Sequence, residues 1–260
     1  MPSLTSCDHA LNFSQGRGII VKSSKRRVNS RQILVQLANW RRNAGISFCL
    51  YALFALVVAR AIDFASLEKQ LVSRFGPVRV VTLREWQANL TNARQSAEME
   101  KLRKVNDFIN RHIEFDEDLS IYHQGDYWAT PLESIGQGRG DCEDLAIIKY
   151  FSLKDSGIAL SKLRLVYVKA RLNDPDGPRL QAHMVLAYYA TPNAEPLVLD
   201  NLVPEILPAS QRKDLHPIFS FNSEAVWNGV AGNSAKGKGG TGQLSRWQDL
   251  LLRARKEGFD

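Results

Sequence analysis

The sequence GRGDCEDLAIIKYFSL, at residues 138–153, predicts a buried helix entered through a tight turn. Gly138 and Gly140 give the backbone freedom to turn, and Asp141 can accept hydrogen bonds as a helix cap. From Leu145 to Leu153 the residues are mostly apolar, with Lys149 as the one charged exception. Cys142 would lie in the first turn, where unpaired backbone N–H groups and the helix dipole favour a thiolate. The stretch therefore indicates a cysteine placed to act as a nucleophile.

The composition favours one globular domain. At 260 residues and 44% hydrophobic, the chain can bury one sizeable core. Its formal net charge of +7 would suit a nucleic-acid partner, but the charge is unevenly distributed. Residues 1–62 hold nine basic side chains and one acidic one, whereas the remainder holds 25 basic and 26 acidic side chains. We therefore expect no nucleic-acid partner for the folded part.

Residues 1–61 have the parts of a basic extension followed by a signal peptide. Arg41 and Arg42 precede an apolar run at 46–58, and Ala-Arg-Ala at 59–61 resembles a cleavage site. The run is shorter than the roughly 20 apolar residues of a transmembrane helix. We expect cleavage near Ala61 and a periplasmic protein. An uncleaved membrane anchor and a buried core helix are the alternatives.

Cysteine usage points to the same stretch. The chain has cysteines at positions 7, 49 and 142, and the first two fall in the segment expected to be removed. The mature protein would keep a single thiol and could form no internal disulfide, although export leads to an oxidising compartment. A lone cysteine kept there shifts the weight toward catalysis.

The order of predicted elements indicates an α+β domain at residues 62–228. Helical patterns come first, at 66–75, 82–90 and 93–113. Residues 114–137 read as irregular and rich in turn formers. Strand-like runs follow at 163–172 and 181–190, joined by a turn as an antiparallel hairpin, with a third run at 197–202. Residues 229–260 read as a flexible Gly/Lys-rich tail with a short helix at 244–256.

A cysteine nucleophile needs a base, and His183 is the strongest candidate. It lies in the apolar run at 182–186, where a buried polar ring needs a partner. Asp200 can supply that partner, because it ends the apolar run at 197–199 on an expected neighbouring strand. Taken singly, His183 could be a satisfied core histidine and Asp200 a strand-end cap. With Cys142 they form a more specific pattern, a Cys-His-Asp triad.

The motifs resemble the bacterial transglutaminase-like cysteine proteinases, the LapG-type periplasmic enzymes. GDCEDLAIIKY begins at Gly140, HMVL at His183 and LDNL at Leu199, and DYWATP at 126–131 and FSFN at 219–222 also fit. The resemblance spans roughly residues 65–228. It implies a papain-like or transglutaminase-like fold, in which N-terminal helices pack on an antiparallel sheet. It also implies that Cys142 is the nucleophile, His183 the general base and Asp200 its orienter.

The resemblance further implies a biological role. Members of this family cut large surface adhesins near their N-termini, at a di-alanine site, and so release cells from biofilm. An inner-membrane receptor that senses cyclic di-GMP in the cytoplasm holds the protease in check. We therefore expect an adhesin as the substrate and such a receptor as the partner.

Three acids surround the predicted nucleophile: Asp141, Glu143 and Asp144. Uncompensated carboxylates would raise the pKa of the Cys142 thiol, so a cation such as calcium could offset them. From spacing alone, the favoured interpretation is that these acids cap the helix and complement its positive end. The resemblance favours calcium, because LapG-type enzymes bind this ion through the acids around the nucleophile and need it for activity.

Two other functional classes remain open at this stage. A transglutaminase or amidase would use the same triad and thioester chemistry, and only the acceptor would differ. A non-catalytic calcium-stabilised binding module would use the acids but not the thiol.

Overall fold

The computed structural model describes residues 62–175, 177–229 and 245–259. The predicted basic extension and signal peptide, at 1–61, lie outside the described residues, as does most of the Gly/Lys-rich linker, at 230–244. Among the helices that are described, we find none with the length and apolar character needed to cross a membrane.

Helices and antiparallel strands follow one another along the chain, as the sequence predicts. The helices are α2 (Phe64–Phe75), α3 (Val80–Arg94), α4 (Glu98–His112), α5 (Asp118–Tyr122), α6 (Pro131–Gln137), α7 (Cys142–Asp155) and α8 (Ser245–Glu257). The strands are β1 (Glu114–Phe115), β2 (Arg139–Gly140), β3 (Leu163–Asp174), β4 (Gly177–Tyr188), β5 (Leu197–Leu199), β6 (Leu207–Pro208), β7 (Leu215–Phe221) and β8 (Val226–Asn228).

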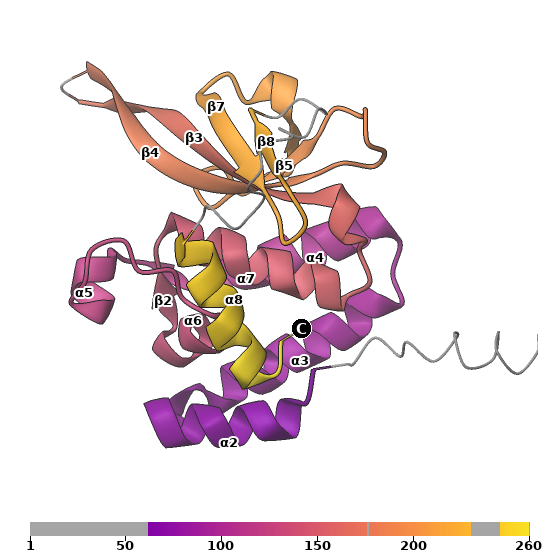
Figure 1. Cartoon of the computed structure of the whole chain (residues 1–260), viewed down its shortest axis with the longest axis vertical. Helices are drawn as coiled ribbons and strands as arrows, with labels where there is room; N and C mark the ends of the chain where they lie inside the picture. The colour runs from indigo at the N-terminus through magenta and orange to yellow at the C-terminus, as the bar shows by residue number, and fades with distance from the viewer. Residues whose placement is uncertain (1–61, 176, 230–244, 260) are drawn as a thin grey trace, which may run out of the picture. The chain divides into compact units, whose positions relative to one another are not determined.

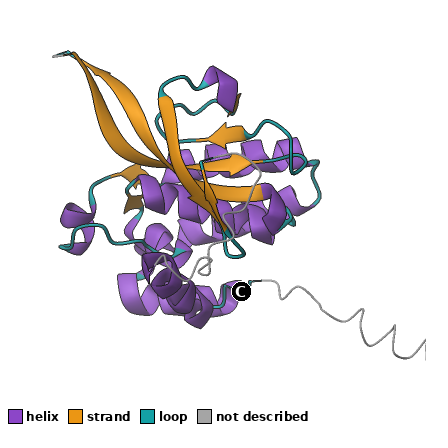
Figure 2. Ribbon diagram, turned by 45° about the horizontal axis from the view of Figure 1, so that its top comes forward, coloured by secondary structure: helices purple, strands orange, loops and turns teal. Residues whose placement is uncertain are grey.

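The helices lie against one face of a six-stranded sheet (Figure 1). The strand order is β6-β5-β4-β3-β7-β8, and every neighbouring pair is antiparallel. The β3–β4 hairpin extends well beyond the other strands (Figure 2). A separate short parallel pair, β1 with β2, leads directly into α7. The α+β fold class is therefore confirmed.

The helix that begins at Cys142 is the centre of the hydrophobic core. Residues 144–153 of α7 are buried without a break, so this helix has no solvent-facing side along most of its length. It packs against α4 on one side and against β4 on the other. The Lys149 side chain, the polar exception in the sequence, is also fully buried. Because α7 is fixed on all sides, its first turn is held rigidly at the end of the sheet.

The helical predictions are confirmed in position and differ in extent. The helix predicted at 93–113 is broken: α3 runs to Arg94, the backbone of Ala97 is extended, and α4 begins only at Glu98. The segment predicted as irregular, 114–137, contains the short helices α5 and α6. A capping box between Thr130 and Glu133 starts α6, a local signal that the prediction overlooked.

The hairpin prediction is confirmed, with strands longer than expected and the register Leu163↔Tyr188. The third predicted strand ends at Leu199, so Asp200 follows the strand instead of lying within it. One central strand, β7, was not predicted. It contains Pro217, which argues against a strand interior, but the proline lies beside a register shift between Tyr167 and Val168.

The helix expected near the C-terminus is present as α8, and it completes the core of the domain. Trp247 is fully buried. Its ring packs against aromatic rings from the rest of the domain, namely Trp128, Tyr150, Phe151 and Phe221. The sequence placed this helix in a tail outside the domain, whereas the structure makes it part of the same hydrophobic cluster.

Candidate active site

The first turn of α7 is shaped by the two residues that precede Cys142. The carboxylate of Asp141 caps the helix, with Oδ1 accepting hydrogen bonds from the backbone N–H groups of Glu143 (3.1 Å) and Asp144 (3.2 Å). Gly140 must lack a side chain, because a Cβ at this position would lie 2.7 Å from the Cβ of Asp144. The predicted cap and tight turn are therefore both present.

Cys142 is half-buried at the start of α7, and its thiol is surrounded by acids. The S–H group donates to Oε2 of Glu143 at 2.7 Å. The backbone N–H of Met184, on β4, is directed at the sulfur and favours its thiolate. Burial, with the charges of Glu143 and Asp141, nevertheless raises the pKa of the Cys142 thiol well above its usual value. Without a compensating positive charge, these acids keep the thiol protonated.

His183 and Asp200 meet in the interior, on neighbouring parts of the sheet. His183 lies on β4, and Asp200 directly follows β5, which pairs with β4. Nε2 of His183 lies 2.7 Å from Oδ1 of Asp200, and both side chains are almost fully buried. Because Asp200 binds Nε2, Nδ1 is the ring nitrogen that can exchange a proton with a thiol. Met184, which follows His183, carries the N–H directed at Cys142.

A further residue, Arg212, supports this pair and was not predicted. Its Nη2 donates to Oδ2 of Asp200 at 2.7 Å, and its guanidinium also binds Asp214. Burial opposes ionisation of Asp200, but the hydrogen bonds and charges of His183 and Arg212 lower the pKa of this carboxyl to about 2. Asp200 is therefore ionised at neutral pH. Nothing local in the sequence links Arg212 to Asp200.

The structure thus brings His183 and Asp200 into direct contact and places Cys142 against the strand β4, which carries His183. His183 and Asp200 form an ion pair if the ring is protonated. Cys142 is in contact with the strand that carries His183, although its proton is directed at Glu143. The catalytic roles of the three residues stay predictions at this point.

A second cluster of acids adjoins the thiol. Asp118, Asp141 and Asp144 each offer a carboxylate oxygen, and these oxygens lie within 4.8 Å of one another. Two of the three acids belong to the set predicted from the sequence. Asp118, from α5, was not predicted, and Glu143 is turned toward the thiol. The acidic run Asp116-Glu117-Asp118 was the available local signal, but only the fold brings Asp118 to the site.

The chemistry of this cluster suits a divalent cation. Oδ1 of Asp118 and Oδ2 of Asp144 are buried and have no hydrogen-bond partner among the described residues. Burial, then the charges of Asp144 and Glu143, raises the pKa of Asp141 to about 10. Burial likewise raises the pKa of Asp118 to about 6. Buried carboxylates that lack basic partners are stable together when they are protonated or when they share a cation, and calcium prefers such oxygens.

Comparisons with known proteins identify relatives of this chain. A family model described as bacterial transglutaminase-like cysteine proteinase matches residues 83–230. The structure of Legionella pneumophila LapG is similar, with 36% sequence identity and a TM-score of 0.61, and the match covers 75% of this chain and 98% of that chain. No curated protein sequence matches at a significant level.

Two further structures of the Legionella pneumophila protein differ in their metal state. The calcium-bound form is 36% identical, with a TM-score of 0.61, over 74% of this chain and 99% of that chain. The EGTA-treated form is 35% identical, with a TM-score of 0.62, over 75% of this chain and 98% of that chain. Calcium is thus bound by a protein with this fold.

Proposed function

This chain belongs to the bacterial transglutaminase-like cysteine proteinases and is a cysteine peptidase, and on this basis we propose that it is a calcium-dependent periplasmic endopeptidase that cuts the N-terminal region of a large surface adhesin. The observation that carries the proposal is the buried contact of His183 with Asp200 beside the helix that begins at Cys142. The family membership separates this function from the transglutaminase and binding-module alternatives.

The arrangement supports a thiolate mechanism. Nδ1 of His183 takes the thiol proton while Asp200 holds Nε2 and stabilises the imidazolium. The sulfur attacks the peptide carbonyl, and the backbone N–H of Cys142 would donate to the developing oxyanion, since the N–H groups of Glu143 and Asp144 are bound by Asp141. His183 then gives the proton to the leaving amine, which leaves a thioester on Cys142. Water hydrolyses the thioester and regenerates the thiol.

Asp118, Asp141 and Asp144 are the residues that would hold calcium, with further oxygens from the backbone or water. A bound ion supplies positive charge beside Cys142. The chain's own carboxylates raise the pKa of the Cys142 thiol. The positive charge of a bound ion would offset this effect and favour the thiolate.

Calcium is expected to stabilise the folded protein. At a calcium concentration about 100 times Kd, a site present only in the folded state adds about 2.7 kcal/mol to the free energy of unfolding, which raises Tm by roughly 5–10 °C. Thermal unfolding in calcium and in EGTA measures this shift. Asp118→Asn is expected to abolish it, whereas Asp116→Asn should preserve it, because Asp116 is paired with Arg139 instead. An equal shift in both variants would contradict the assignment.

The substrate assignment is tested by cleavage. We expect a protein that begins at Ile62 to convert an adhesin N-terminal fragment with a di-alanine site into two defined products in calcium, and to leave it intact in EGTA. A fragment in which the two alanines are replaced by arginines is the matched control and should stay whole. Cleavage of both fragments, or of neither, would argue against this substrate class.

Regulation by an inner-membrane receptor is the remaining part of the proposal. A receptor that senses cyclic di-GMP in the cytoplasm would bind the protease in the periplasm and withhold it from the adhesin. The support for this partner is the family membership. A pull-down with the receptor's periplasmic domain, with adhesin cleavage as the second readout, tests it.

A further inference from the structure

The segment at 126–130 lies between the acid cluster and α8. Its backbone N–H groups bind two of the acids: Tyr127 N donates to Oδ2 of Asp118 at 2.5 Å, and Ala129 N donates to Oδ1 of Asp144 at 2.7 Å. Those bonds use one oxygen of each carboxylate and leave the other without a partner among the described residues. The segment therefore fixes which carboxylate oxygens remain free for a cation.

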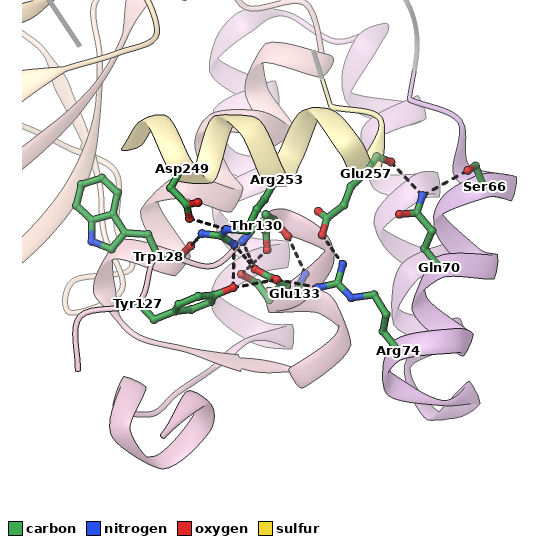
Figure 3. Close-up of polar contacts among 11 residues, drawn as sticks. Ser66, Gln70, Arg74, Tyr127, Trp128, Thr130, Glu133, Asp249, Arg253 and Glu257 are labelled. Carbon is green, nitrogen blue, oxygen red and sulfur yellow. Dashed lines mark hydrogen bonds and ion pairs between the residues drawn. The ribbon is translucent and has the colours of Figure 1, made fainter. Parts of the chain in front are cut away.

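Two arginines of α8, Arg253 and Arg246, bind the opposite side of the same segment. Figure 3 shows the contacts of Arg253. Nη2 of Arg253 donates to the carbonyl oxygen of Trp128 at 2.6 Å. Nε of Arg246 donates to the carbonyl oxygen of Asp126 at 3.1 Å. The arginines are seven residues apart, two helical turns, so they lie on the same face of α8.

The two sets of hydrogen bonds share the same peptide groups. The carbonyl of Trp128 and the N–H of Ala129 belong to one planar peptide unit and point in opposite directions. That unit joins Arg253 to Asp144. In the same way, the peptide unit between Asp126 and Tyr127 joins Arg246 to Asp118. A hydrogen bond to the carbonyl polarises the N–H and strengthens its bond to the carboxylate.

The arginines also hold the backbone turn at Asp126. Asp126 has φ of 61°, a left-handed conformation that residues other than glycine, asparagine and aspartate seldom adopt. Arg246 also forms an ion pair with the side chain of Asp126 at 2.7 Å. Arg253 adds a contact with the hydroxyl of Tyr127 at 2.9 Å. The C-terminal helix thus holds the segment in the conformation that orients the acids.

We infer that Arg253 and Arg246 are positioning residues of the cation site, which hold Asp144 and Asp118 through two shared peptide groups. The inference rests on the proposed calcium binding and extends it to a helix outside the family-matched residues 83–230. Arg253 has the larger effect on the cation site, because water weakens its hydrogen bonds less: its side chain is 23% exposed, whereas that of Arg246 is 55% exposed.

Calcium titration of metal-free protein by calorimetry tests the inference. Arg253→Met is expected to raise the calcium Kd roughly tenfold, as the loss of a partner that orients metal ligands does, and the more exposed Arg246→Met to raise it roughly threefold. Arg255→Met is the surface control, since this arginine is exposed on the same helix. At saturating calcium, Arg253→Met should recover most of its cleavage activity, which a general loss of structure would not allow.

Arg74→Met is the matched control for lost stability. Arg74 binds Glu133 and Glu257, so it joins α2 to the same ionic network without contacting the 126–130 segment (Figure 3). We expect this variant to lower Tm and leave the calcium Kd unchanged. Far-UV circular dichroism in EGTA checks that each variant is folded.

Tyr127→Phe, which removes only the hydroxyl, is the milder second variant and should raise the calcium Kd about twofold.

The outcomes separate this inference from the proposed function. An unchanged Kd in folded Arg253→Met overturns the positioning role and leaves the protease assignment intact. An equal rise of Kd in Arg74→Met also overturns it, because stability alone would then explain the effect. Failure of the unaltered protein to bind calcium would overturn the cation site and this inference together, while cleavage independent of calcium would still identify a protease.

Discussion

Cys142→Ala is expected to lower kcat/KM for adhesin cleavage by roughly a thousandfold or more, while the protein keeps its fold and its calcium-induced rise in Tm. The reason is chemical: alanine has no atom that can form the thioester. Cys142 is only half-buried, and its Sγ contacts Glu143 and the N–H of Met184, so its loss removes little packing. Cys142→Ala should therefore lose activity without losing stability.

The controls use the other members of the predicted triad. His183→Ala should lower activity to a similar extent, and the double variant with Cys142→Ala should be no worse than either single variant, since the residues act as a unit. In a protein that begins at Ile62, Cys142 is the single thiol, so its alkylation rate reports the thiolate directly. Retained cleavage by Cys142→Ala, or unchanged alkylation in His183→Ala, would refute these roles.

Local signals in the sequence were sufficient for the helix start and for the His183–Asp200 pair. The glycines before Asp141 and the apolar residues after it define a buried helix through short-range preferences alone. His183 stands out because it interrupts an apolar run, and Asp200 because it ends one. The separate expectation that their strands are neighbours is confirmed by the pairing of β4 with β5. The fold class follows from the order of these elements.

The parts that could not be predicted depend on contacts between distant segments. Asp118 reaches the acid cluster from α5, more than twenty residues before Asp141. It stands in an acidic run with Asp116 and Glu117, and nothing in the sequence shows which of these acids meets Asp141. Arg212 follows Asp200 by twelve residues and meets it only because the loop after β6 folds back. The α8 helix was recognised by its amphipathic pattern, but a pattern cannot show what its apolar face covers.

Arg212→Met is expected to lower the free energy of unfolding by about 3–5 kcal/mol at neutral pH, because it leaves the buried carboxylate of Asp200 without its cationic partner. The guanidinium is almost fully buried and binds Oδ2 of Asp200 at 2.7 Å, while His183 holds Oδ1. Methionine fills much of the same space and supplies no donor, so Oδ2 would remain unsatisfied. Urea unfolding of the metal-free protein, followed by fluorescence, measures the change.

The pH dependence of that change identifies its origin. Asp200 has a folded pKa of about 2 against an ordinary 3.8, so its ionisation adds about 2.5 kcal/mol of stability that is present above pH 4 and lost as the pH falls through about 2. Asp214, whose pKa Arg212 also lowers through a hydrogen bond, contributes in the same direction. Arg212→Met should raise the pKa values of both Asp200 and Asp214.

The stability difference between Arg212→Met and the unaltered protein is therefore expected to be constant from pH 7 to about pH 5 and to narrow toward pH 3. Lys213→Met removes an equal charge from the exposed neighbouring residue and should change stability by no more than about 0.5 kcal/mol at any pH. A difference that stayed constant down to pH 3 would mean that Arg212 acts through packing. In that case, the low pKa of Asp200 would have to depend on His183 and not on the arginine.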